Sequence, residues 1–116
     1  MNIQTILQSM QVQLQTFHWQ TTSYAQHIAF GDAYTALQPL VDSFMESYIG
    51  ITDKRPKAES IQLVDLQEGN PKSWCTKKIG ALRKIRDAME RYPELVNICD
   101  EIIALLSKLS YLLTLD

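Results

Sequence analysis

Four separate segments of this sequence place apolar residues three and four positions apart, which is the spacing of one buried face of an α-helix. We therefore predict helices over about residues 3–21, 24–49, 74–91 and 93–113. Only four glycines and four prolines occur among the 116 residues, so long regular elements fit better than many short strands and turns. The length suits one domain of common size, which we take to cover residues 1–116.

Local capping residues mark the starts of three of these helices. Ser23, followed three residues later by Gln26, predicts a capping box at the start of the second helix. Ser73 can cap the third helix, and Pro93 with Glu94 is typical of the first turn of the fourth. The second helix contains a glycine and a proline, but its apolar stripe continues past both and favours one helix.

Helical periodicity weakens between residues 50 and 73, whereas the other two connections are short. About twenty residues is long for neighbouring antiparallel helices but can carry the chain from one end of a bundle back to the other. The order of short loop, long crossover and short loop predicts an all-α, ferritin-like four-helix bundle, which has one long connection. An up-down-up-down bundle is the alternative. The fourth helix is apolar over more than half of its girth, so it is central or covered by a partner chain.

Composition narrows the classes of function. No run approaches the ~20 apolar residues of a membrane span, and the first residues lack a basic stretch, so we expect neither a membrane segment nor a secretory signal. Cys75 and Cys99 form no metal or redox motif, so we expect buried thiols in a reducing, cytoplasmic compartment. The formal charge of −2 disfavours nucleic acid as a partner, because phosphate-backbone binders are normally basic.

Two histidines and two acids form the one arrangement that suggests chemistry. His18 and His27 flank the turn between the first two helices, and Asp42 and Glu46 lie one turn apart on the second. Residues 42 and 46 lie about 60° and 100° round the helix from His27, so all three share one side. However, helical rise separates His27 from Asp42 by roughly 22 Å, whereas metal–ligand bonds are only ~2.0–2.2 Å. One chain therefore cannot bring them to one ion.

Two chains can bring these residues together. If two copies of the second helix pack antiparallel about a two-fold axis, His27 of one copy approaches Asp42 and Glu46 of the other. His18 then joins from its own chain across the short turn. Mixed imidazole and carboxylate ligation suits iron, manganese or zinc better than calcium or magnesium. The geometry therefore predicts a homodimer with two inter-subunit metal sites, whose ligands are His18, His27, Asp42 and Glu46.

The same residues carry a resemblance to a known family. His18 with the tryptophan after it, His27 followed three residues later by Phe30, and acids at offsets of fifteen and nineteen resemble the Dps branch (DNA protection during starvation) of the ferritin-like superfamily. The block Phe17–Gln20, followed by a histidine and an Asp-x-x-x-Glu pair, is also similar to short ferritin-like proteins of tailed phages. The resemblance covers under half of the chain.

The resemblance implies both a fold and an activity. Members of the Dps family are four-helix bundles that oxidise iron at inter-subunit sites, with ligands from the first two helices. For this chain it implies Fe(II) capture, at a mononuclear or dinuclear site, by His18, His27, Asp42 and Glu46, and oxidation by dioxygen or peroxide. Zinc or manganese could take the same ligands. It also implies a homodimer, a larger Dps-like shell if iron is stored, and, for a phage protein, the host cytoplasm.

Two departures from the family pattern leave an alternative open. Gly31 stands where the pattern has an acid four residues after the second histidine, and Asp32 is one step and about 100° away. The second half of the chain has no histidine, which excludes a ferritin-type di-iron centre inside one bundle. The alternative is a structural or interaction dimer with a degenerate, inactive metal site. A further hypothesis is a nucleic-acid or regulatory adaptor that uses the basic face of the third helix.

Overall fold

Helices make up all the regular secondary structure that the computed structural model contains in residues 2–67 and 70–115, the part of the chain that it describes. They are α1 (Ile3–Gln20), α2 (Tyr24–Thr52), α3 (Pro71–Ala88) and α4 (Pro93–Leu112). The all-α prediction is confirmed, and α1, α2 and α4 end within three residues of their predicted bounds. α2 is one helix that continues through Pro39, as its apolar stripe predicted.

The start of α3 corrects one prediction. The side-chain oxygen of Asn70 accepts hydrogen bonds from the backbone N–H groups of Lys72 and Ser73 at 3.0 and 3.2 Å, so Asn70, rather than Ser73, caps the helix. Pro71 takes the first helical position, where the N–H that proline lacks would have no intrahelical partner. The turn residues predicted here therefore begin a helix; Gly69, which precedes them, lies outside the described residues.

Two other helix ends differ from the sequence expectation in detail. α3 ends at Ala88, three residues early, because the chain turns before Pro93, whose ring disfavours helical geometry at the preceding residue. Ser23 caps α2 as predicted and accepts from the Gln26 N–H at 3.3 Å. The side chain of Gln26 does not complete the capping box; it accepts from the Thr21 hydroxyl at 2.8 Å instead.

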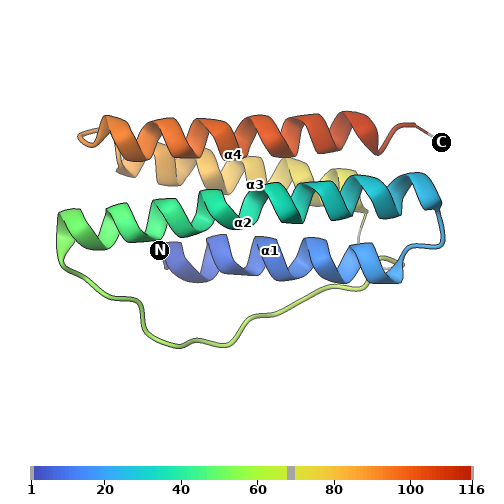
Figure 1. The fold of residues 1–116 in the computed structure, drawn as a ribbon, viewed down its shortest axis with the longest axis horizontal. Coiled ribbons are helices and arrows are strands. Elements are labelled where there is room, and N and C mark those ends of the chain that lie inside the picture. The colour runs from blue at the N-terminus through green and yellow to red at the C-terminus, as the bar shows by residue number, and fades with distance from the viewer. Residues whose placement is uncertain (1, 68–69, 116) are drawn as a thin grey trace.

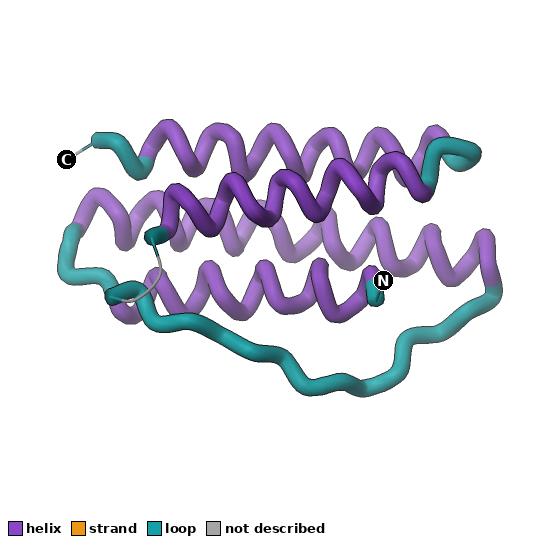
Figure 2. The backbone as a smooth tube through the Cα atoms, turned by 180° about the vertical axis from the view of Figure 1, so that it is seen from behind, coloured by secondary structure: helices purple, strands orange, loops and turns teal. Residues whose placement is uncertain are grey.

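The helices pack as two antiparallel hairpins. Short turns join α1 to α2 and α3 to α4, whereas the crossover, residues 53–70, runs from the end of α2 along the bundle to the start of α3 (Figures 1 and 2). α2 and α3 therefore run parallel to each other. α2 also packs against α4, and α1 and α3 touch at only a few residues. The result is a four-helix bundle with one long connection.

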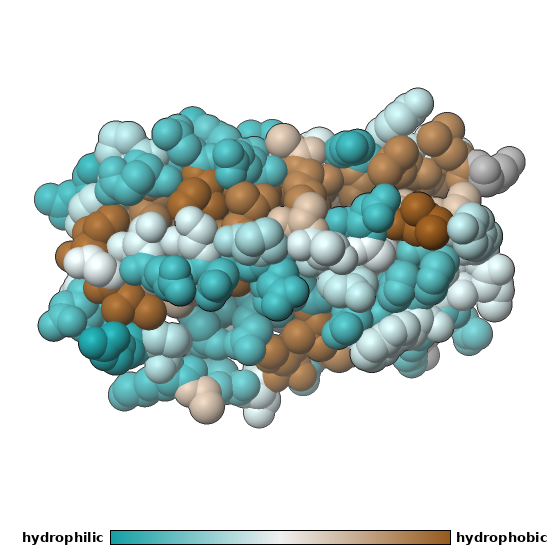
Figure 3. All heavy atoms as spheres, in the orientation of Figure 1, coloured by the Kyte–Doolittle hydropathy of each residue, from teal (hydrophilic) through white to brown (hydrophobic). Residues whose placement is uncertain are grey.

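The buried face of each helix follows its predicted stripe. Side chains with no exposed surface come from all four helices: Leu7, Met10, Leu14, Phe17, Phe30, Leu37, Phe44, Cys75, Leu82, Ile85, Leu95, Cys99, Ile102 and Leu106. α4 is not central within one chain, since among the described residues it packs against α2 and α3 but not α1. Its apolar residues Leu105 and Leu112 line the boundary with α2, where Figure 3 shows a band of hydrophobic colour. Among the described helices, none combines the length and hydropathy needed to cross a bilayer.

Glutamines on α1 hold the crossover against the bundle. Gln13, which is only 3% exposed, donates to the Val64 carbonyl and accepts from the Val64 N–H, both at 2.8 Å. Gln20 accepts from the Leu66 N–H and donates to the Asp65 carboxylate, again at 2.8 Å. A buried amide must find such partners, because an unpaired one loses its hydration without compensation. These bonds fix the second half of the crossover along α1.

The Gln13–Val64 pair leads to a first prediction. Gln13→Ala removes two hydrogen bonds and buried volume, so we expect the free energy of unfolding to fall by about 1–3 kcal/mol in urea titrations. Native-state trypsin cleavage after Lys57 in the crossover should also become faster, because the segment opens more often. Gln15→Ala, on the same helix, is the control and should leave the cleavage rate unchanged. Equal acceleration of cleavage in both variants would show that the Gln13–Val64 hydrogen bonds do not hold the crossover.

The two thiols give a second prediction. Cys75 and Cys99 are free and buried, as the sequence predicted, and burial raises the pKa of each from 9.0 to about 11. Well below pH 9 both thiols are neutral in the folded and the unfolded chain. Between pH 9 and about 11 the unfolded chain ionises first, so the free energy of unfolding should fall over this range. Urea titrations of Cys75→Ala/Cys99→Ala should show a smaller fall; an unchanged pH dependence would count against the role of these thiols.

Candidate functional site

His18 and His27 lie face to face beside the turn between α1 and α2. Their ring centroids are 3.8 Å apart and the rings are inclined by only 17°. They meet because only Thr21–Ser23 separate the two helices, so the last turn of α1 lies beside the first turn of α2. The ring of Tyr34 meets the His18 ring edge-on at 5.4 Å. The structure thus brings together the two histidines that the sequence predicted to share a site.

Each histidine ring is fixed by the backbone of the other residue. His18 Nδ1 lies 2.7 Å from the His27 carbonyl oxygen, and His27 Nδ1 lies 3.0 Å from the His18 carbonyl oxygen. Because a carbonyl oxygen can only accept, both Nδ1 atoms carry a hydrogen and donate it. In the neutral form of each ring, the Nε2 atom then holds the lone pair, and neither Nε2 has a hydrogen-bond partner among the described residues.

Gly31 makes room for the His18 ring. A Cβ atom at this position would lie 2.8 Å from His18 Cε1 and 3.0 Å from His18 Nδ1, closer than packed side-chain atoms approach. An acid at position 31, as in the Dps pattern, would therefore displace the imidazole. The glycine that the sequence marked as a missing ligand has a packing role, which depends on a contact between two helices.

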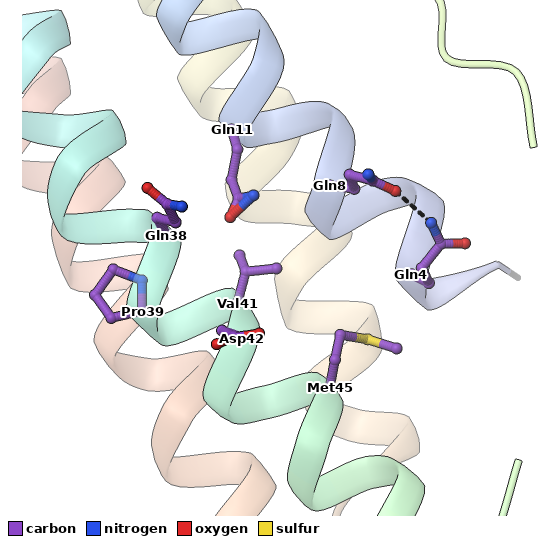
Figure 4. Close-up of a pocket in the computed structure, with 8 residues that line it drawn as sticks. All are labelled: Gln4, Gln8, Gln11, Gln38, Pro39, Val41, Asp42 and Met45. Atoms are coloured by element: carbon purple, nitrogen blue, oxygen red, sulfur yellow. Dashed lines mark hydrogen bonds between the residues drawn. The ribbon is translucent and has the colours of Figure 1, made fainter. Parts of the chain in front are cut away.

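Asp42 and Glu46 lie elsewhere on the exposed side of α2. Asp42 lines a groove of about 480 Å³ between α1 and α2, together with four glutamine side chains (Figure 4). Helical rise puts it roughly 22 Å along α2 from His27. Within residues 2–67 and 70–115, no three His, Cys, Asp or Glu side chains gather where they could hold one ion. One chain therefore supplies a histidine pair without the acids.

The face that carries this groove is poor in charge. α1 contains no Asp, Glu, Lys or Arg, and glutamines line its side of the groove. Gln11 and Gln38 continue the groove to Tyr34, next to the histidines. At that end Trp19 and Tyr24 are 69% and 79% exposed. Few charges and exposed aromatic rings are typical of surfaces that contact another protein. This α1/α2 face is continuous from the histidine pair to Asp42.

Fold and site together define an all-α four-helix bundle whose first hairpin is closed by two stacked histidines. Residues 18–113, more than half of the chain, match the family of unknown function DUF5856, and the protein belongs to that family. No curated protein and no solved structure matches the chain. The matched segment includes both histidines and both acids.

The contact at Gly31 gives a third prediction. A Cβ atom at Gly80 would meet nothing within 4 Å, so Gly80→Ala should raise the free energy of unfolding by about 0.5–1 kcal/mol through helix propensity alone. Gly31→Ala should instead lower it, because the His18 ring must move. Urea titration gives the stability, and the imidazole NMR resonances report the ring. Equal gains at positions 31 and 80 would contradict the packing role.

Proposed function

We propose that the chain binds a divalent transition metal, with iron as the first choice, at two equivalent sites between the subunits of a ferritin-like, Dps-like dimer. His18 and His27 of one copy and Asp42 and Glu46 of the other would be the ligands. The observation that carries the proposal is the hydrogen bonding of the histidine pair, which uses both Nδ1–H groups and leaves both Nε2 lone pairs available. Metal-binding histidines commonly donate their second ring N–H to a backbone carbonyl in this way.

The two rings would have to tilt apart to share an ion. Each Nε2 lone pair lies in the plane of its ring, and the two planes are inclined by only 17° with centroids 3.8 Å apart, so the lone pairs do not converge while the rings are stacked. Two imidazoles leave further coordination positions to be filled, and carboxylates complete a mixed set that suits iron, manganese or zinc. One chain gathers no third ligand among its described residues, so the proposal takes the carboxylates from a second copy.

A two-fold axis across the middle of α2 would supply those carboxylates. Thr35 lies midway between His27 and the acidic pair, about 80° round the helix from His27 and so on the same side, and it is exposed. With two α2 helices antiparallel about this point, each histidine pair meets the acids of the other copy. The small side chain of Thr35 at the crossing allows the helices to approach closely. The contact would also cover the charge-poor α1/α2 face, and the parallel course of α2 and α3 supports a ferritin-like bundle.

Iron oxidation and storage are finer parts of the same proposal. In oxidation, iron is the substrate: two Fe(II) ions each lose one electron, and one peroxide with two protons becomes two water molecules. Gly31 leaves the site one carboxylate short of the Dps pattern, so metal binding stands independently of oxidation. Storage of iron would need a shell larger than a dimer, and measuring the mass of the assembly tests whether such a shell forms.

The fourth prediction concerns metal binding. Anaerobic calorimetric titration with Fe(II), and separately with Mn(II) and Zn(II), should show one site per chain in a protein that light scattering finds at least dimeric. His27→Ala and the double variant Asp42→Asn/Glu46→Gln should each weaken binding by at least about tenfold. Asp32→Asn, which changes another exposed acid on α2, is the matched control and should bind like wild type. A wild type that binds none of the three metals would overturn the proposal.

Mixing the inactive variants tests whether the site is shared. In a heterodimer of His27→Ala with Asp42→Asn/Glu46→Gln, one site receives the intact histidines and the intact acids, so it has all four ligands. The other site receives the mutated residues of both chains. Unfolding and refolding the two variants together should therefore restore up to about a quarter of the wild-type capacity. A site formed within one chain would show no such recovery.

A structural role is the second candidate, and the packing of His18 on Gly31 favours it. In that case the two histidines only join α1 to α2, and the α1/α2 face holds a dimer or another protein without metal. Both candidates share the interface, so the metal titration separates them. A dimer of wild-type stability that binds no metal supports the structural role.

A further inference from the structure

A second site lies on another side of α1, where the bundle is least closed. α1 and α3 touch at only a few residues, and the crossover bridges them through the bonds of Gln13 to Val64. A cavity of about 520 Å³ opens at this seam, between α1, the crossover and the first turns of α3. This volume lies within the range of about 300–1,000 Å³ that is typical of small-molecule sites. The cavity shares no lining residue with the histidine pair or the Asp42 groove.

One wall of the cavity is a rigid aromatic ring. Trp74 is only 9% exposed, and its ring meets the Phe17 ring edge-on, with centroids 5.7 Å apart. The core contact fixes the ring while its remaining surface lines the cavity. The indole N–H has no hydrogen-bond partner among the described residues, and an indole can only donate. This wall offers a flat apolar surface to a ligand.

Two cations flank that ring. Lys77 and Lys78 follow Trp74 by three and four residues on α3, so the three side chains share one helix face, and all line the cavity. In the described part of the chain the one ion pair joins Arg86 to Asp100, so neither lysine is paired there. The other polar side chains in the lining carry an amide, the Ser73 hydroxyl or the Trp74 indole N–H, and no described Asp or Glu contributes. The cavity is therefore electropositive.

We propose that this cavity binds a small planar organic anion. The anionic group, a phosphate or a carboxylate, would lie between Lys77 and Lys78, where the charges of both lysines favour it. The planar part would lie against Trp74, and the Ser73 hydroxyl can donate to an oxygen of the anion. The inference does not depend on the metal site, because the two sets of residues are separate.

The test reads the indole of Trp74 directly. Trp19→Phe leaves Trp74 as the one tryptophan, so a single indole N–H resonance remains in the NMR spectrum. Titration with 1-naphthyl phosphate or 1-naphthoate should shift this resonance saturably, and the tighter of the two identifies the preferred anionic group. Neutral 1-naphthol and inorganic phosphate should each bind at least about tenfold more weakly. No shift with either anion up to about 10 mM, or equal binding of 1-naphthol, would overturn the inference.

Matched charge variants separate the cavity from the general charge of α3. Lys77→Ala/Lys78→Ala should weaken the anion by at least about tenfold. Arg83→Ala/Lys84→Ala removes the same charge from the same helix outside the cavity and should change affinity by less than about twofold. Equal losses of affinity in both variants would mean that only the overall charge of α3 attracts the anion, which would contradict binding in the cavity. Metal titration of the first variant should match wild type, so either proposal can fail without the other.

Discussion

Two imidazole N–H groups, each bonded to the other residue's backbone carbonyl, close the first hairpin at its turn. The last carbonyls of a helix have no N–H one turn further on to accept from, and the His18 carbonyl is in that position at the end of α1. His27 supplies the missing donor from the first turn of α2. The ring of His18 then lies on the Cα of Gly31, which is why this position has no side chain. The packing of α1 on α2 therefore fixes the orientation of both imidazole rings.

Because α2 is one continuous helix, any metal site that combined the histidines with the acids would depend on assembly. A rigid helix keeps His27 and Asp42 roughly 22 Å apart however its side chains turn. A monomer would offer an ion two imidazoles and water, whereas a symmetric dimer would offer two imidazoles and two carboxylates. Metal and partner would then stabilise each other, because an ion that binds only the dimer shifts the association equilibrium towards it. Affinity for metal would rise with protein concentration, which a site within one chain has no reason to show.

The spacing of apolar residues predicted the helices well because burial of one face decides where a helix forms. Residues such as Leu14 and Leu106 mark that face in the sequence. The sequence also predicted that His18 and His27 meet, since a short turn places the end of α1 beside the start of α2. The predicted N-cap of α3 was wrong because Asn70 and Ser73 both suit that role, and because the proline between them is also common in loops. The meeting of the histidines with the acids stays a prediction, because it depends on a second chain.

The remaining surprises share a physical cause, which is the path of the crossover. Gln13 is buried although nothing near it in sequence is unusual, because its partner Val64 is 51 residues away. The same long segment spaces α1 from α3 and leaves the cavity beside Trp74. Two of the sides of α1 are thus covered, one by the core and one by the crossover. A charged side chain is costly wherever water is excluded, and α1 has none even on its third side, which faces the Asp42 groove. The lack of charge there is what a helix would show if that side, too, were covered by a second copy of the chain.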